Sequence, residues 1–173
     1  MNLDMKNQKG FSLIELLIVV VIIGIIAAIA IPNLLAARRS ANEGSAVSAM
    51  RTLHGAQFTY ASTYGNNNYA GTQSGGGATD AVALAALMAP GLIDSNLGSA
   101  QKSGYNYVGG AITATAALPA QFCLSALPVT TTGVTATGTR RFGIATDGVI
   151  KGETAPAAQY ADLAAVQAAP VLP

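Results

Sequence analysis

Residues 10–31 read GFSLIELLIVVVIIGIIAAIAI, and this stretch decides the fold of the chain. From Phe11 to Ile31 only Ser12 and Glu15 are polar. At about 1.5 Å of rise per residue, a helix of this length extends ~31 Å, close to the ~30 Å hydrocarbon core of a bilayer. The sequence therefore predicts one membrane-spanning helix near the amino terminus, with the carboxylate of Glu15 at its head.

The composition leaves room for one globular domain beside this helix. The chain has 173 residues, 51% of them hydrophobic and 10% charged. The residues after position 37 are enough for a single compact domain but not for two. The net charge is +1, and one basic pair, Arg38 and Arg39, is too short to follow a phosphate backbone. We therefore expect no specific nucleic-acid partner.

The leader MNLDMKNQKG carries Lys6 and Lys9 against Asp4, which favours an amino terminus in the cytoplasm and a domain outside it. The apolar run that follows has three interpretations. The first is a secretory signal peptide, with small residues for cleavage at Ala28-Ile29-Ala30. The second is a plain signal anchor, in which Glu15 is tolerated near the interface because a deeper carboxylate costs about 2.5 to 3.5 kcal/mol. The third interpretation comes from a resemblance.

The segment from Lys9 to Leu16, KGFSLIEL, resembles the class III signal of type IV prepilins and type II secretion pseudopilins. The resemblance implies that a membrane peptidase cuts after Gly10 and methylates the new amino terminus at Phe11. Gly10 suits such a cut because it has no Cβ to obstruct the backbone. The resemblance also implies that Glu15 pairs with the terminal amine of a neighbouring subunit in the filament.

This resemblance also implies a fold, a set of partners and a location. The fold class is α+β, with a long amino-terminal helix packed on a small antiparallel sheet of about three or four strands. The partners are other copies of the chain in a homopolymer filament, a prepilin peptidase, an inner-membrane assembly platform with its ATPases, and lipid before assembly. The precursor is expected in the bacterial inner membrane and the filament at the cell surface.

Two other functions stay open at this point. One is a type II secretion pseudopilin of the same architecture. The other belongs to a different class, a signal-anchored periplasmic domain that binds a ligand or catalyses a reaction.

Gly24 and Pro32 are expected to be points of bending or melting in the long helix. Pro removes an intrahelical hydrogen bond and Gly weakens a helix. The family resemblance implies that the segment between them loses helicity when a filament forms. A modest kink at the membrane exit is equally compatible with the sequence.

Beyond Pro32 the pattern predicts a continuing amphipathic helix to about Tyr64. Its inward stripe recurs at spacings of three and four. The stripe consists of Ala46, Met50, Leu53, Gln57 and Tyr60, widened by Val47, Ala49 and Phe58. The charged residues Arg38, Arg39, Glu43 and Arg51 are expected on a side that faces solvent or another subunit.

The remainder indicates a loop, a short helix and strands. Residues 65–78 are expected to form a loop. Tyr64, just before it, and Tyr69, within it, are expected to be partly buried anchors or a contact surface, and Asp80 is expected to cap a helix through about Met88. Strand signals lie at residues 105–108, 111–115, 121–127, 141–145 and 149–151, the last two joined in a hairpin by Thr146-Asp147-Gly148. Residues 130–139 read as a linker between strands. The whole chain divides into a leader (1–10), a transmembrane and filament-core helix (11–37), an amphipathic helix (38–64), a loop, short helix and sheet (65–154), and a loose Ala/Pro-rich tail (155–173).

Catalytic or metal chemistry has little support in the sequence. His54 and Cys123 are the only residues of their types, so a Cys-His pair is arithmetically possible, but packing roles are expected for both. The acidic residues Asp147, Glu153 and Asp162 are too dispersed for a calcium site of the kind many major pseudopilins carry. A lone cysteine also excludes the intrachain disulfide of many pilins, so hairpin pairing is expected to hold the carboxyl-terminal region. We expect no enzyme activity, metal or cofactor.

Overall fold

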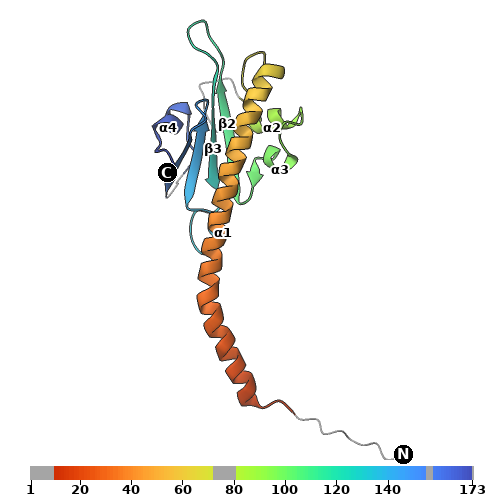
Figure 1. Cartoon of the computed structure of the whole chain (residues 1–173), viewed down its shortest axis with the longest axis vertical. Helices are drawn as coiled ribbons and strands as arrows, with labels where there is room; N and C mark the ends of the chain where they lie inside the picture. Colours follow the sequence, from red (N-terminus) through yellow and green to blue (C-terminus); the bar gives the residue numbers. More distant parts are fainter. Residues whose placement is uncertain (1–9, 72–80, 155–157, 173) are drawn as a thin grey trace, which may run out of the picture. The chain divides into compact units, whose positions relative to one another are not determined.

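The computed structural model describes residues 10–71, 81–154 and 158–172 (Figure 1). The chain divides into two compact units, Met1–Ala37 and Arg38–Pro173. Helix α1, Leu13–Thr63, belongs to both of them.

In the first unit α1 is, by length and composition, long and apolar enough to cross a membrane. Its large apolar side chains from Leu13 to Ile31 are all more than half exposed. The helix is α-helical through Gly24 and Pro32. A bend or melting at these two residues therefore stays a prediction.

Within its described residues, the second unit contains an antiparallel sheet of five strands in chain order. The strands are β1 (Gln101–Lys102), β2 (Tyr105–Ile112), β3 (Gln121–Pro128), β4 (Arg140–Ala145) and β5 (Ile150–Thr154). The α+β class is confirmed, but the expected number of strands, three or four, was too low. Strand β1 has only two residues, too few to give a pattern. Gly109 and Gly110 interrupt the β-prone residues of what is one continuous strand, β2.

The predicted hairpin between β4 and β5 is confirmed. Ile144 pairs with Ile150, and the intervening turn has Gly148 at φ +72°, in the left-handed region that favours glycine. The Asp147 carboxylate accepts a hydrogen bond from the Val149 backbone N–H at 3.1 Å. The Thr146-Asp147-Gly148 sequence therefore forms the predicted turn between β4 and β5.

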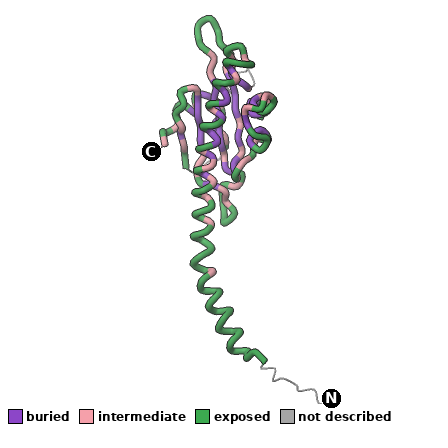
Figure 2. Tube along the Cα trace, turned by 45° about the vertical axis from the view of Figure 1, so that its right-hand side comes forward, coloured by how far each residue is buried: buried purple, intermediate pink, exposed green. Residues whose placement is uncertain are grey.

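The core lies between the sheet and the second part of α1 (Figure 2). Ala46, Met50, Leu53 and Gln57, on the predicted stripe, are buried, and Tyr60 is partly buried. Helices α2 (Val82–Met88) and α3 (Ser95–Gly98) complete this core. The N-cap position of α2 is Ala81, while Asp80, the predicted cap, lies outside the described residues.

A second, smaller core covers the other side chains of β3. Phe122 and Leu124 belong to the α1 core, whereas Cys123 packs with Tyr160 and Val166, as expected for the alternation of side chains along a strand. Helix α4, Leu163–Ala168, supplies this cover, and the Asp162 side chain caps it by accepting from the Ala165 N–H at 2.8 Å. The loose tail expected over residues 155–173 was therefore wrong for its described part.

Hydrogen bonds to β5 secure the end of the chain without a disulfide. The Gly152 N–H donates to the Pro170 carbonyl at 3.0 Å, and the Leu172 N–H donates to the Ile150 carbonyl at 3.2 Å. Lys151 is buried and its ammonium donates to the Gln167 carbonyl. The carboxyl-terminal region is thus held by the expected β4–β5 hairpin and also by the bonds of Pro170 and Leu172 to β5.

Gln57 is fully buried and holds the segment after α1. Its side-chain amide makes the same two hydrogen bonds to Ala70 that a paired backbone residue would make. Its amide donates to the Ala70 carbonyl at 2.9 Å and accepts from the Ala70 N–H at 2.8 Å. We expect Gln57→Leu to lower the free energy of unfolding by about 2 kcal/mol, because both Ala70 groups lose their partner inside the core. Denaturant unfolding of the full chain in detergent measures the change, and unchanged stability would contradict this role.

A matched control lies two residues further along the helix. Thr59 is exposed, and its hydroxyl donates to the Gly55 carbonyl of the same helix at 3.2 Å. Thr59→Ala should change the free energy of unfolding by less than about 0.5 kcal/mol.

Candidate functional site

The bond between Gly10 and Phe11 lies outside α1, in an uncovered segment. Neither residue is helical, Phe11 is 87% exposed, and a Cβ added to Gly10 would meet no atom within 4 Å. Helix α1 begins two residues later, at Leu13. A protease therefore has access to a non-helical backbone at this bond without unwinding a helix.

Glu15 closes the first turn of α1 on its own chain. The Ser12 backbone N–H donates to the Glu15 carboxylate at 2.9 Å, and the Leu16 N–H donates to the Ser12 carbonyl at 3.3 Å. Ser12 is thus the N-cap residue and Glu15 the third residue of the helix, the spacing of a capping box. Ser12 was not predicted as a cap, although the pattern Ser-x-x-Glu before an apolar run is the signal for one.

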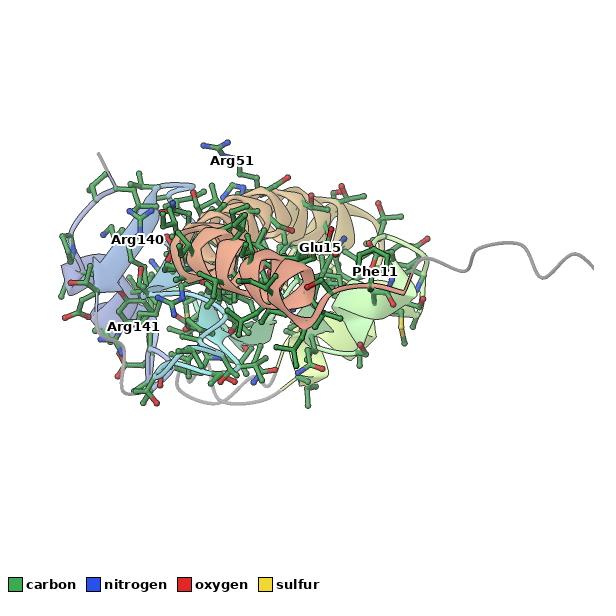
Figure 3. All side chains as sticks on the ribbon, turned by 90° about the horizontal axis from the view of Figure 1, so that it is seen from below. Phe11, Glu15, Arg51, Arg140 and Arg141 are labelled. Carbon is green, nitrogen blue, oxygen red and sulfur yellow. The ribbon has the colours of Figure 1, made fainter. Side chains whose placement is uncertain are left out.

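This geometry gives Glu15 a defined electrostatic position. Its carboxylate lies at the positive end of the helix macrodipole, where a negative charge is stabilised. It also accepts from the backbone N–H of Ser12, the residue next to Phe11 (Figure 3). If the chain were cut after Gly10, the nitrogen of Phe11 would become a cationic amine. A carboxylate has about four acceptor sites, so the single bond to Ser12 leaves capacity for a further donor.

Glu43 is buried, which corrects the expectation that it faces solvent or another subunit. It is 8% exposed and accepts from the Thr139 N–H at 2.8 Å, the Thr139 hydroxyl at 2.7 Å and the Arg140 guanidinium at 3.0 Å. Burial raises the pKa of this carboxyl, but the bonds from Thr139 and the charge and bond of Arg140 outweigh burial and hold the pKa below its usual value.

The three arginines expected on the same side differ among themselves. Arg38 and Arg51 are exposed, and Arg51 extends away from the ribbon in Figure 3. Arg39 is partly buried and donates to the Gly133 carbonyl at 2.9 Å and to the Ala136 carbonyl at 3.3 Å. A sequence pattern does not identify these partners, since they lie more than ninety residues away along the chain.

His54 and Cys123 do not form a catalytic pair. The His54 ring packs on Phe58 and Phe122, with ring centroids 4.9 Å and 5.5 Å away, on the α1 side of the sheet. Cys123 points to the opposite side, and burial raises its pKa to about 11. A thiol with so high a pKa remains protonated at neutral pH and is a poor nucleophile. Both residues therefore have packing roles, as expected.

The acidic residues considered for calcium have separate structural partners. Asp147 accepts from Val149, Asp162 caps α4, and Glu153 forms an ion pair with Arg141. Within residues 10–71, 81–154 and 158–172, no three His, Cys, Asp or Glu residues lie close enough to hold a metal ion.

The tyrosines beside the loop after α1 differ in exposure. Tyr69 is buried and its ring packs on Phe122 with centroids 4.6 Å apart, so it anchors the loop. Tyr64 is exposed, and its ring centroid lies 6.1 Å from that of Tyr60.

Comparison with known proteins identifies the amino-terminal segment. The family model described as the prokaryotic N-terminal methylation motif matches residues 5–31. The chain is 69% identical over 39 residues to the type IV wide pilus major component PilA4 of Thermus thermophilus, covering 22% of this chain and 30% of that protein. The residues matched by this methylation motif include Gly10, Phe11 and Glu15.

Two further relatives match this chain over longer stretches. The type II secretion system core protein G of Klebsiella pneumoniae is 35% identical over 71 residues, covering 41% of this chain and 49% of that protein. The type IV major pilin protein PilA of Myxococcus xanthus is 44% identical over 54 residues, covering 31% and 24%. No solved structure gives a significant match.

The chain spans half or less of the length of these relatives. Over the matched residues it is homologous to type IV pilins and to type II secretion pseudopilins. The long apolar helix packed on an antiparallel sheet is consistent with the pilin fold.

Proposed function

We propose that this chain is a structural subunit of a type IV pilus, not an enzyme. It is made as a membrane-anchored precursor, cut after Gly10, methylated on the nitrogen of Phe11 and polymerised through α1. The observation that carries the proposal is the exposed Gly10–Phe11 bond at the head of an uncovered apolar helix, inside the matched methylation motif.

The apolar part of α1 has two environments in this proposal, first lipid and then the helices of other copies. Lipid is as apolar as the helix, so transfer between them gains little hydrophobic free energy. Transfer into the filament is favoured instead by three contributions. These are close packing, pairing of Glu15 with a neighbour's amine, and an inner-membrane assembly platform with its ATPases. The finished filament then lies at the cell surface, and the peptidase that cuts at Gly10 is the other required partner.

Gly24 and Pro32 are proposed as the places where α1 bends or loses helicity during this transfer. No other part of the described chain packs against the helix at Gly24, since a Cβ added to this residue would meet no atom within 4 Å. Pro32 lacks the N–H that would bond the preceding turn. Residues 11–37 form the filament-core segment in this proposal, and residues 1–10 form the leader.

A second candidate is a pseudopilin of a type II secretion system. One observation favours it: the similarity to core protein G runs over 71 residues, against 39 for PilA4. Imaging of sheared surface filaments, with mass-spectrometric identification of this chain in them, supports a pilus. Filaments confined to the periplasm would support the pseudopilin.

Mass spectrometry of the amino terminus of the cellular protein tests the processing step. The expected mature chain begins at methylated Phe11. A chain that begins at Ile31 would indicate a secretory signal peptide, and an intact Met1 would indicate a plain anchor; either result contradicts the proposal.

Gly10→Val should abolish cleavage, because the added side chain obstructs the bond that the peptidase must reach. The expected product is the uncut, membrane-inserted precursor, detected by the same measurement. Leu13→Val, inside the helix, is the matched control and should be cut normally.

A further inference from the structure

Residues 170–172, here called the strap, lie along the outer edge of strand β5. The Gly152 N–H donates to the Pro170 carbonyl at 3.0 Å, and the Leu172 N–H donates to the Ile150 carbonyl at 3.2 Å. These two bonds flank one antiparallel bridge between the strap and the strand. Because β4 pairs with the inner edge of β5, the strap occupies the position that a further strand of the sheet would take.

Side chains on both faces of the sheet hold the strap in place. On one face, Lys151 is buried and its ammonium donates to the Gln167 carbonyl, in the helix that leads into the strap. On the other face, Leu172 packs against the α1 core. Gly152 makes room for this leucine, since a Cβ added there would lie 2.8 Å from the Leu172 side chain. The strap therefore fits a place on β5 that is shaped for it.

The opposite edge of the sheet is protected in a different way. Strand β1 has two residues, one of which is Lys102, and a very short edge strand that carries lysine discourages pairing with another chain. Ala100 and Ser103, on either side of it, have φ +64° and +49°, so the extended backbone does not continue past them. Of these two edge strands, β5, with five residues, is the one long enough to pair with a strand of another molecule.

We propose that the strap is an autoinhibitory contact, which covers a strand-addition site on β5 and keeps the sheets of two copies from joining. An exposed sheet edge can take up an extended strand of another chain through main-chain hydrogen bonds. Once the strap leaves, the occupant of this site is β5 of a second copy in antiparallel orientation. A two-fold axis brings the same edge of both molecules together, so each supplies the N–H and carbonyl groups that the other needs.

The strap has a consequence for the filament proposed above. A filament concentrates the second units of many copies, and uncovered β5 edges there would join sheets in competition with packing through α1. The strap leaves α1 as the route of assembly. This consequence rests on the proposed function, whereas the covered edge involves residues of the second unit alone.

Removal of the strap tests the inference, with every variant otherwise carrying the full chain in detergent. A chain that ends at Ala169 lacks the strap but keeps α4 and the residue that binds Lys151. We expect it to form pairs at concentrations at which the wild type does not, measured by light scattering after size-exclusion chromatography. Hydrogen exchange at the Gly152 N–H should be about tenfold faster than in the wild type when the variant is dilute, and slow again when it pairs.

Leu172→Asp is a second variant, which keeps the length of the chain. It places a carboxylate where leucine packs on the core, and the cost of burying this charge releases the strap. Val171→Asp is its matched control, because Val171 is 62% exposed and makes neither strap bond through its backbone. Leu172→Asp should pair like the shortened chain, and Val171→Asp should behave like the wild type.

Two results would overturn the inference. One is a shortened chain and a Leu172→Asp variant that keep the size of the wild type at every concentration, with fast exchange at Gly152 throughout. The other is slow exchange at Gly152 in the dilute shortened chain, because another segment would then cover the edge. Neither measurement depends on processing, so an uncut amino terminus would contradict the proposed function and leave the strap unaffected.

Discussion

Replacing Glu15 with alanine is expected to abolish filaments while leaving the chain inserted in the membrane at the normal level. In the proposed assembly each subunit brings a cationic Phe11 amine into an apolar filament core, and the carboxylate of a neighbour neutralises it. Removing one member of a buried ion pair costs about 3 to 5 kcal/mol. Every joint in the filament would bear this cost, so a loss of more than 100-fold in association per subunit is expected, at about 1.4 kcal/mol per tenfold.

Glu15→Gln separates the observed hydrogen bond from the Ser12 N–H from the proposed ion pair with the Phe11 amine of a neighbour. The amide oxygen of glutamine still accepts a hydrogen bond, so the bond from the Ser12 N–H and the start of α1 are retained. The charge is lost, so filaments should still be absent. Electron microscopy of sheared cells, with immunoblots of membrane fractions, measures both outcomes.

Normal filaments with Glu15→Gln would show that the carboxylate acts only as a helix cap. Normal filaments with Glu15→Ala as well would remove the assembly role and favour a plain signal anchor. The two variants thus distinguish capping, ion pairing and the absence of either function.

Glu43→Ala is expected to lower the free energy of unfolding by about 3 kcal/mol. The buried carboxylate accepts two bonds from Thr139 and one from Arg140, and these bonds join α1 to the start of β4. Hydrogen bonds to charged groups contribute about 1.5 to 3 kcal/mol each but do not add fully. Arg51→Ala, which removes an exposed charge from the same helix, should change stability by less than about 0.5 kcal/mol.

The effect of Glu43 should depend on pH in a defined direction. Its pKa is lowered by folding, so its ionised form contributes fully at pH values above the unfolded pKa, which lies near 4.5. This contribution is lost as the pH falls through the folded pKa. The difference in unfolding free energy between the wild type and Glu43→Gln should therefore be constant near neutrality and shrink in acid.

Denaturant titrations of the full chain in detergent at a series of pH values measure this difference. A difference that does not change with pH, or that grows in acid, would contradict an ionised Glu43 in the folded protein.

Local patterns predicted the parts of this fold that local chemistry determines. The apolar run defined a span of membrane length, and the three- and four-residue spacing from Ala46 to Gln57 defined the buried stripe. The Thr146-Asp147-Gly148 turn defined the last hairpin because Gly148 takes the positive φ that the turn requires. These features depend on neighbours within a few residues, so sequence alone is sufficient for them.

The errors came from contacts between distant parts of the chain. Glu43 was expected to face outward because a charge on a helix usually does, but Thr139 and Arg140 satisfy it inside the domain. Residues 158–172 looked loose because alanine and proline dominate them, but Tyr160 and Val166 bury themselves on the second face of the sheet. Ser12 was missed for a different reason, since its role follows from a spacing that is visible in the sequence.

The order of the strands in the sheet bears on how the domain forms. Each strand pairs with the next one along the chain, from β1 to β5. Each strand of this meander after β1 therefore finds a partner in the strand that precedes it in the chain. In the proposed membrane-anchored precursor, the sheet can therefore form hairpin by hairpin as each strand emerges on the far side of the membrane, and the residues that bond to β5 come last.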